Sequence, residues 1–440
     1  MTQLLTIDVP NLSSRLSLRR NFTWTFAGNM VYAASQWGVL VVLAKLGSPE
    51  VVGQFALGLA VCAPVILFAN LQLRSVQATD ARREYTFADY LGLRLMTTLA
   101  AYLGIIAIVL LSGYRQETAL VILLIGLAKS FEAISDVIFG LLQQHERMDR
   151  IAKSLMIEGP VTLVVMAVVM ALTGSVVWAV ASMAAAWGLQ LALYNLGSAR
   201  LILRGAGEGS EWRRLRPRFH LGTLRRLGWL ALPLGFAGTL SSLNLNIPRY
   251  FIGYFEGEHQ LGIFATIAAL PMVGVLIINA LGLSAGPRLA QYFRNGDWQA
   301  FRRLRNQLVG IGALVGMLGI VGVLVVGVPV LNLLYSPEYA EAADVLLILM
   351  VAGALQFSYI FLGSALSAMW NFSYQAYVQV ISIVAVVLLC FILVEPYGIR
   401  GAAYAILFKS VFEGAAYIVA LVYSVRRHQQ PSIQDVRKSS

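Results

Sequence analysis

Charged residues are scarce in this sequence: they make up 12% of its 440 residues, whereas 58% are hydrophobic. A soluble protein of this length carries roughly a quarter charged residues, so the composition excludes the soluble globular class. Cysteine and histidine are scarce too, with two and four copies. Cys62 and Cys390 lie in apolar runs far apart in the chain, which argues against a disulfide framework. No spacing of cysteine and histidine matches a metal site.

Nucleotide-binding and hydrolase motifs are missing as well. The chain has no Walker loop, no dinucleotide-binding glycine fingerprint and no convincing Ser/His/Asp arrangement. We therefore expect no catalytic residues, no metal and no other cofactor. ATP hydrolysis and enzymatic activity in general are not expected of this chain.

Long apolar runs dominate what is present. A helix that crosses a bilayer needs about 20 mostly apolar residues. Twelve such runs are found, at residues 22–45, 51–73, 88–112, 118–142, 152–173, 175–199, 227–254, 260–288, 305–334, 342–367, 372–394 and 400–425. The sequence thus predicts an all-α integral membrane protein with twelve transmembrane helices.

The cations are distributed unevenly between the two sides of these spans. With both termini placed in the cytosol, the outer loops hold only Lys45, Arg115 and Arg400. The longest basic stretch is the central loop, with Arg213, Arg214, Arg216, Arg218, Arg225 and Arg226. This asymmetry is typical of the positive-inside rule. The net charge of +11 is therefore interpreted as topology and contact with anionic lipid headgroups, not as nucleic-acid binding.

An internal repeat divides the chain into two halves. The second span opens with Gly53-Gln54-Phe55-Ala56, and the eighth opens with Gly262-Ile263-Phe264-Ala265. Six spans in each half give both halves the same orientation. We expect two pseudo-symmetric six-helix bundles around a central cavity, which favours alternating-access transport. The predicted parts are a cytosolic N-terminal segment (1–21), an N-lobe (22–199), a basic cytosolic linker (200–226), a C-lobe (227–425) and a cytosolic C-terminal tail (426–440).

Polar residues inside the spans are the candidate functional residues, because an ionisable group in a bilayer normally faces protein or a water-filled cavity. In the fourth span, Lys129, Glu132, Asp136 and Gln143 fall within roughly 60° of one another at about 100° per residue, and form one polar stripe. The candidates for substrate binding are Lys129, Arg249, Lys409, Gln36 and Asn246, and those for ion coupling are Glu132, Asp136 and Glu413.

Two interpretations of these residues stay open. Lys129 with Glu132 and Lys409 with Glu413 can be neutralised pairs that fasten helices together, while Arg249 can extend to the membrane interface. Alternatively, they line a hydrophilic cavity in which cations bind an anionic headgroup and carboxylates and amides contact sugar hydroxyls. A buried carboxylate can also carry a coupling proton.

Three stretches resemble the polysaccharide transporter family of the MOP flippase superfamily, the Wzx-type oligosaccharide flippases. They run from Leu46 to Ala56, from Gly140 to Met148 and from Tyr397 to Ala405, and the plan of twelve spans in two halves also agrees. The resemblance implies export of undecaprenyl-diphosphate-linked oligosaccharide repeat units across a bacterial cytoplasmic (inner) membrane. The product pathways would be O-antigen of lipopolysaccharide, capsule or exopolysaccharide.

The resemblance also implies a mechanism and partners. Alternating access would be driven by an H⁺ or Na⁺ gradient instead of ATP. The expected partners are the lipid-linked oligosaccharide, membrane lipids, and the polysaccharide polymerase and glycosyltransferases of the same pathway, with no nucleic acid. The family has no substrate-binding motif strict enough to assign residues here.

Two alternatives remain. One is a MATE-like cation-coupled multidrug exporter, which shares the superfamily plan but would favour acids in one lobe without cavity cations. The other is a membrane-embedded polysaccharide polymerase, which usually needs a sizeable outer loop with Arg, His or acidic groups. The outer loops here are short and hold three cations against eight acids, which disfavours the polymerase. The acids are Glu50, Glu117, Glu256, Glu258, Glu338, Glu341, Asp344 and Glu395.

Overall fold

The structure is a computed structural model that describes residues 17–80, 83–205, 215–369 and 372–429. These residues fold into helices joined by short turns, and no strand occurs among them. The predicted segment 1–21 is described only from residue 17, and the predicted tail only to residue 429. Arg213 and Arg214 of the predicted linker lie outside the described residues.

The described chain divides into two compact units. Unit 1 is formed by residues within Met1–Gly47 and Gly58–Ser242, and unit 2 by residues within Ser48–Leu57 and Leu243–Ser440. Unit 1 contains α1 (Leu18–Leu46), α3 (Leu73–Thr79), α4 (Phe87–Ser112), α5 (Gln116–Gln144), α6 (Met148–Thr173), α7 (Val176–Gln190), η1 (Leu191–Asn195) and α8 (Leu196–Gly205). Unit 2 contains α11 (Gly257–Arg294), α12 (Trp298–Leu334), α13 (Pro337–Ala340), α14 (Ala343–Ala368) and α15 (Phe372–Gln429).

Two helices are shared between the units. The first turns of α2 (Pro49–Asn70) belong to unit 2 and the rest of α2 to unit 1. In α10 (Leu221–Phe255) the order is reversed, because its first part belongs to unit 1 and its last part to unit 2. The predicted lobe boundaries stay a prediction.

Ten helices among the described residues are long and apolar enough to cross a membrane. Two local features account for the difference from the predicted twelve. The helix α5 has 29 residues but carries Lys129, Glu132 and Asp136 in its middle. The helix α15 has 58 residues and contains two predicted spans, which are separated at Gly398 by a non-helical backbone (φ 55°, ψ −135°). The predicted class, an all-α multi-pass membrane protein, is confirmed.

Capping residues set the ends of several helices. Thr86 and Asp89 form a capping box at the start of α4, in which each side chain accepts a hydrogen bond from the other residue's backbone N–H. Gly113 ends α4 and Gly174 ends α6, both with φ of 64°. This left-handed conformation favours glycine.

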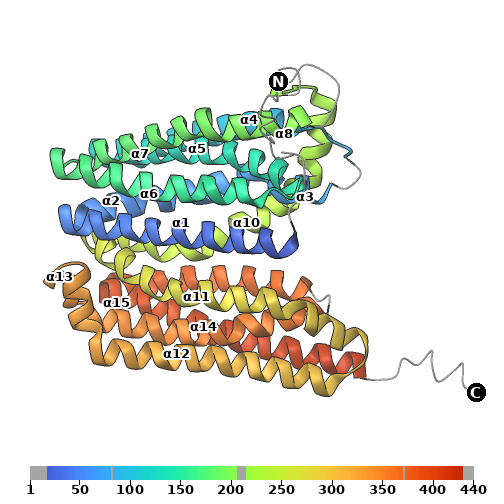
Figure 1. The fold of residues 1–440 in the computed structure, drawn as a ribbon. Helices are drawn as coiled ribbons and strands as arrows, with labels where there is room; N and C mark the ends of the chain where they lie inside the picture. Colours follow the sequence, from blue (N-terminus) through green and yellow to red (C-terminus); the bar gives the residue numbers. More distant parts are fainter. Residues whose placement is uncertain (1–16, 81–82, 206–214, 370–371, 430–440) are drawn as a thin grey trace, which may run out of the picture. The chain divides into compact units, whose positions relative to one another are not determined.

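Long helices run alongside one another in unit 1, where α6 packs against both α1 and α7 (Figure 1). The contact between α1 and α6 is close because a Cβ on Gly28 would lie 2.7 Å from Ala152 Cα, and one on Gly159 would lie 2.9 Å from Ser35 Cβ. Small residues allow this approach in membranes, where apolar burial alone does not drive helix association.

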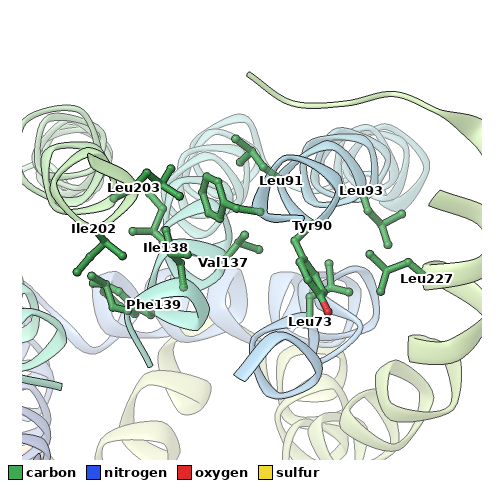
Figure 2. Packing of buried hydrophobic residues seen from close by; sticks show 14 of the residues in the cluster. Leu73, Tyr90, Leu91, Leu93, Val137, Ile138, Phe139, Ile202, Leu203 and Leu227 are labelled. Carbon is green, nitrogen blue, oxygen red and sulfur yellow. The ribbon is translucent and has the colours of Figure 1, made fainter. Parts of the chain in front are cut away.

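An apolar core closes one end of unit 1. Figure 2 shows Leu73, Tyr90, Val137 and Leu227 gathered from α3, α4, α5 and α10. All four side chains are buried. This core fixes α4 against α5 and α3, the three helices that carry the polar residues described below.

In unit 2 the glycines of the internal repeat pack the start of α2 onto the start of α11. A Cβ on Gly53 would lie 1.7 Å from the carbonyl oxygen of Glu258, and one on Gly262 would lie 1.8 Å from that of Pro49. The two recurring motifs therefore touch each other reciprocally. A separate core of unit 2 is built around Phe301 of α12 and Phe357 and Phe361 of α14.

Candidate functional site

The polar stripe predicted on α5 meets charged partners along its length. Lys129 Nζ lies 2.7 Å from Glu132 Oε2, one helical turn away. Asp136, a further turn along, faces two arginines and is partly exposed. Gln143, near the end of the helix, accepts a hydrogen bond from Nε of Arg74 at 3.1 Å. The stripe is thus one side of an extended ionic network within the membrane-spanning part of unit 1.

Two guanidinium groups flank the Asp136 carboxylate. Arg94 Nη2 lies 3.3 Å from Asp136 Oδ2, and Arg74 Nη1 lies 3.5 Å from Asp136 Oδ1. Arg74 comes from α3 and also lies over the ring of Phe139, 5.5 Å from its centroid. Each oxygen of the carboxylate therefore has a cation of its own.

Arg94 is completely buried. Its Nη1 donates to the side-chain oxygen of Asn70 at the end of α2. Its Nε is shielded from solvent and has no hydrogen-bond partner among the described residues. A buried guanidinium with a spare N–H can donate a further hydrogen bond to an anionic or carbonyl oxygen, because its donors form a planar fork.

A second cluster surrounds Lys129. Its ammonium lies 5.1 Å from the centroid of the Trp187 ring on α7, close enough for a cation–π interaction. The indole N–H of Trp187 donates to Thr162 Oγ1 at 2.8 Å. One turn before Thr162 on α6, the buried Glu158 lies within electrostatic range of Glu132 and Lys129. Lys129 is thus shared between two acids and an aromatic face.

Gln36 lies on α1, on the same side of unit 1 as this cluster. Its side chain interacts with Tyr32, and Tyr32 in turn lies within electrostatic range of Glu132 and Glu158. The structure therefore brings four of the predicted residues together in unit 1, with Arg74, Arg94, Glu158 and Trp187 as further members of the site. The four predicted residues are Gln36, Lys129, Glu132 and Asp136.

The candidates on the second half of α15 form a compact group in unit 2. Lys409 Nζ lies 3.5 Å from Glu413 Oε1, and the hydroxyl of Tyr359 on α14 donates to Glu413 Oε2. Tyr359 stacks on Tyr417 with the ring centroids 5.6 Å apart. Glu413 and Tyr359 are buried. The predicted pair of Lys409 and Glu413 is present, and the Tyr359 hydroxyl binds the second oxygen of the Glu413 carboxylate.

Arg249 and Asn246 interact with each other on the last part of α10. Arg249 Nη1 donates to Asn246 Oδ1 at 3.1 Å. Asn246 is buried and Arg249 is half-buried. Both residues belong to unit 2.

Several residues of the site were not among the predicted candidates, and Arg94, Glu158 and Tyr359 are three of them. The first two are lone ionisable groups inside apolar runs, which is the signal that selected Lys129 and Asp136. Tyr359 gave no comparable signal, because a tyrosine in a span is usually a packing or interface residue. Among the described residues, no group of three or more His, Cys, Asp or Glu side chains is arranged to hold a metal ion.

The sequence matches a known family over most of its length. The model of a family described as "Polysaccharide biosynthesis protein" matches residues 18–293. The chain belongs to this family. The capsular polysaccharide biosynthesis protein CapF of Staphylococcus aureus is 27% identical over 387 residues, which cover 88% of this chain and 95% of CapF. The probable low-salt glycan biosynthesis flippase Agl15 of Haloferax volcanii is 25% identical over 154 residues, 35% of this chain and 33% of Agl15.

Solved structures of MOP-superfamily transporters share the fold. An inward-facing multidrug resistance MATE family transporter superposes with a TM-score of 0.71 at 15% identity, covering 94% of this chain and 99% of that one. The lipid II flippase MurJ, in an inward closed conformation, gives a TM-score of 0.70 at 12% identity, covering 92% and 87%. At these identities the likeness concerns the fold alone.

Family and fold together confirm the predicted resemblance. The chain belongs to the polysaccharide biosynthesis family, and its fold is that of multi-pass transporters of the MOP superfamily. Agl15 is described as a probable flippase, and MurJ, which shares the fold, is a lipid II flippase.

Proposed function

We propose that the protein moves undecaprenyl-diphosphate-linked oligosaccharide repeat units across the bacterial cytoplasmic membrane, for O-antigen, capsule or exopolysaccharide biosynthesis. The observation that carries this proposal is the pair of guanidinium groups, Arg74 and Arg94, on either side of Asp136 in unit 1. Arginine forks match phosphate oxygens, and a diphosphate is the anionic part of such a substrate.

The site offers separate groups for the two parts of the headgroup. Arg94 keeps a spare Nε donor, and Lys129 supplies a second cation with an aromatic surface beside it. Amides near these cations, those of Asn70 and Gln143, are suited to sugar hydroxyls, since each amide both donates and accepts hydrogen bonds. Arg249, Asn246 and Lys409 supply comparable groups in unit 2, and Gln36 supplies one in unit 1.

Carboxylates beside the cations suit coupling to an H⁺ or Na⁺ gradient. While Asp136 is ionised, it occupies both arginines. Protonation of Asp136 would release them for a diphosphate, and deprotonation would favour release of the diphosphate. Glu132 and Glu413 are each paired with a lysine, and protonation of either acid would likewise free its lysine for the diphosphate. Alternating access of two lobes would expose the site first to the cytosol and then to the outside.

The remaining parts of the proposal concern topology and partners. The distribution of cations supports cytosolic termini. The transporter would act without a cofactor and without catalysing a reaction. It would receive its substrate from glycosyltransferases and deliver it to a polymerase on the outer side.

Transport by purified protein in proteoliposomes tests this function. The probe is a fluorescent undecaprenyl-diphosphate oligosaccharide, and its accessibility to an external quencher reports translocation. We expect wild-type protein to translocate the probe, faster with a pH or Na⁺ gradient than without. Arg74→Gln and Arg94→Gln should each reduce the rate at least about tenfold, the effect of losing about 1.4 kcal/mol of binding.

Matched controls sharpen the result. Arg226→Gln removes an exposed cation of α10 outside the network and should leave the rate unchanged. Full activity after combined substitution of Lys129, Arg249 and Lys409 would contradict their assignment to the headgroup. If the protein instead exports cationic amphipathic compounds and ignores the glycolipid, the multidrug alternative holds.

A further inference from the structure

A long groove runs along unit 1 between α2, α4 and the first part of α10. It has a volume of about 790 Å³, and its lining is almost entirely apolar. Its lining includes Phe68, Met96, Ala100, Leu224, Trp229 and Leu232. None of them belongs to the ionic network described above.

The groove is open along its side. Met96 is 43% exposed and Trp229 is 65% exposed. Because these helices cross the membrane, the exposed side faces lipid tails. The lining runs from Pro64 to Ala69 on α2, with Leu71 just after the end of that helix, and from Leu93 to Ala101 on α4, about 8 and 12 Å at 1.5 Å per residue. The groove walls therefore match about one leaflet of a hydrocarbon core about 30 Å thick.

One charged residue lines the groove. Arg225 lies one turn from the start of α10, within the predicted basic linker, and its side chain is exposed. No ion pair of Arg225 is found among the described residues. An apolar channel with a cation at one end is complementary to a lipid that has an anionic headgroup and a long hydrocarbon tail.

The wall between this groove and the ionic network is a single helix layer thick. Leu93 lines the groove, whereas its neighbour Arg94 binds Asn70 and Asp136 in the network. At the end of α2, Ala69 and the following turn residue Leu71 line the groove, whereas Asn70 between them accepts the hydrogen bond from Arg94. Neighbouring residues of the same helix thus line the apolar groove on one side and contribute to the ionic network on the other.

We propose that the groove of α2, α4 and α10 holds the part of the polyprenyl chain nearest the diphosphate while the headgroup occupies the ionic network. This inference rests on the proposed function, since it assigns a second contact region to the same substrate. Arg225 meets the diphosphate at the cytosolic leaflet, and Arg94 and Arg74 meet it further in. The remainder of the chain stays among the lipid tails.

Physical considerations favour the substrate tail over an ordinary phospholipid as the occupant. Lipid tails are as apolar as the groove, so transfer into it gains little hydrophobic free energy. Selectivity must therefore come from the phosphate contacts and from the shape of the channel. A diphosphate carries more charge for Arg225 and Arg94 than a phospholipid phosphodiester does. A competition experiment between undecaprenyl diphosphate and a phospholipid therefore identifies the occupant of the groove.

Photocrosslinking of the full-length protein in nanodiscs tests the proposal. The probe is undecaprenyl diphosphate with a diazirine in the isoprene units nearest the phosphate, and labelled positions are mapped by mass spectrometry. We expect labelling at Phe68, Met96 and Trp229. An excess of unlabelled undecaprenyl diphosphate should reduce this labelling on the order of tenfold, whereas the same excess of phosphatidylglycerol should not.

Substitutions on the groove provide a second measurement. Met96→Trp should fill the channel and abolish labelling at Trp229. The matched control is Leu103→Trp on the same helix, because Leu103 is 56% exposed but does not line the groove; it should leave labelling unchanged. Arg225→Gln should weaken labelling, whereas Arg226→Gln at the next position should not.

The outcomes separate this inference from the proposed function. Labelling spread evenly over lipid-facing positions, Leu103 included, would overturn the inference. So would equal competition by phosphatidylglycerol, which would make the groove a phospholipid site. If wild-type protein translocates the glycolipid in proteoliposomes under either result, the proposed function stands without the groove. Specific labelling in the groove without any translocation would contradict the function and keep the groove as a polyprenyl site.

Discussion

The guanidinium of Arg94 on α4 lies 3.3 Å from the carboxylate of Asp136 on α5, and the arginine side chain is completely shielded from solvent. Within a membrane, burying either charge alone is costly, and the cost falls only if the partners hold each other and their remaining polar atoms are satisfied. Arg74 and Asn70 contribute to this by binding Asp136 and Arg94 respectively. Four residues from α2, α3, α4 and α5 therefore depend on one another.

Removal of Arg94 should destabilise unit 1 strongly. Arg94→Gln leaves Asp136 with Arg74 alone, and we expect the free energy of unfolding to fall by about 3 kcal/mol, as for other broken buried pairs. The double variant Arg94→Gln/Asp136→Asn removes both charges and should recover much of this loss. Thermal unfolding of the purified protein in detergent measures both changes. Equal losses in the single and the double variant would contradict mutual neutralisation.

The length and hydropathy of the helices could be predicted from the sequence because these properties are local. The same holds for the pairing of Lys129 with Glu132, since residues three positions apart share a helix face. The length and mostly apolar composition of residues 118–142 predict a span, and α5 is a helix of 29 residues there.

The long-range part of the site could not be predicted in this way. Arg94 is the single cation of α4, and nothing in its neighbourhood indicates that Asp136, 42 positions later, is its partner. The same is true of Tyr359 and Glu413, which are 54 positions apart. Such pairs depend on which faces of two helices pack together, and one sequence does not determine those faces. The glycine contact between the repeats is also tertiary, although the recurring motif pointed to the two positions.

The aromatic face beneath Lys129 should contribute measurably to its placement. Trp187→Phe and Trp187→Leu both remove the hydrogen bond to Thr162, but only the leucine variant removes the ring. We expect Trp187→Leu to be less stable than Trp187→Phe by about 1 kcal/mol, within the range for a partly desolvated cation–π contact. Thermal or chemical unfolding in detergent provides the comparison. In a Lys129→Met background the difference should shrink; if it persists unchanged, it arises from ring packing alone.

The hydroxyl of Tyr359 should hold Glu413 in place. Tyr359→Phe keeps the ring stacked on Tyr417 but deprives the buried carboxylate of a donor. Hydrogen bonds to charged groups contribute about 1.5 to 3 kcal/mol, so we expect a loss of about 2 kcal/mol in unfolding free energy. Tyr417→Phe, which retains the stack and the Tyr359 hydroxyl, is the matched control and should cost clearly less. The assignment is wrong if the control is as damaging, or if Tyr359→Phe costs as much in a Glu413→Gln background as it does in the wild-type protein.

The reciprocal glycines of the repeat should tolerate no side chain. A methyl group at Gly53 or Gly262 would overlap the carbonyl oxygens of Glu258 or Pro49, and these are backbone atoms that cannot rotate away. Overpacking at such a contact costs about 1 to 3 kcal/mol, so Gly53→Ala and Gly262→Ala should each lower the thermal midpoint in detergent by several degrees. Gly322 on α12 is the control, because a Cβ there would meet no atom within 4 Å. Gly322→Ala should be neutral or stabilising, by up to about 1 kcal/mol, since alanine favours helix.

The two repeat positions also contact each other's helices, so Gly53→Ala/Gly262→Ala should cost less than the sum of the single variants. Once the first methyl group has separated α2 from α11, the second finds part of its space already open. Full additivity would show that the two contacts act independently.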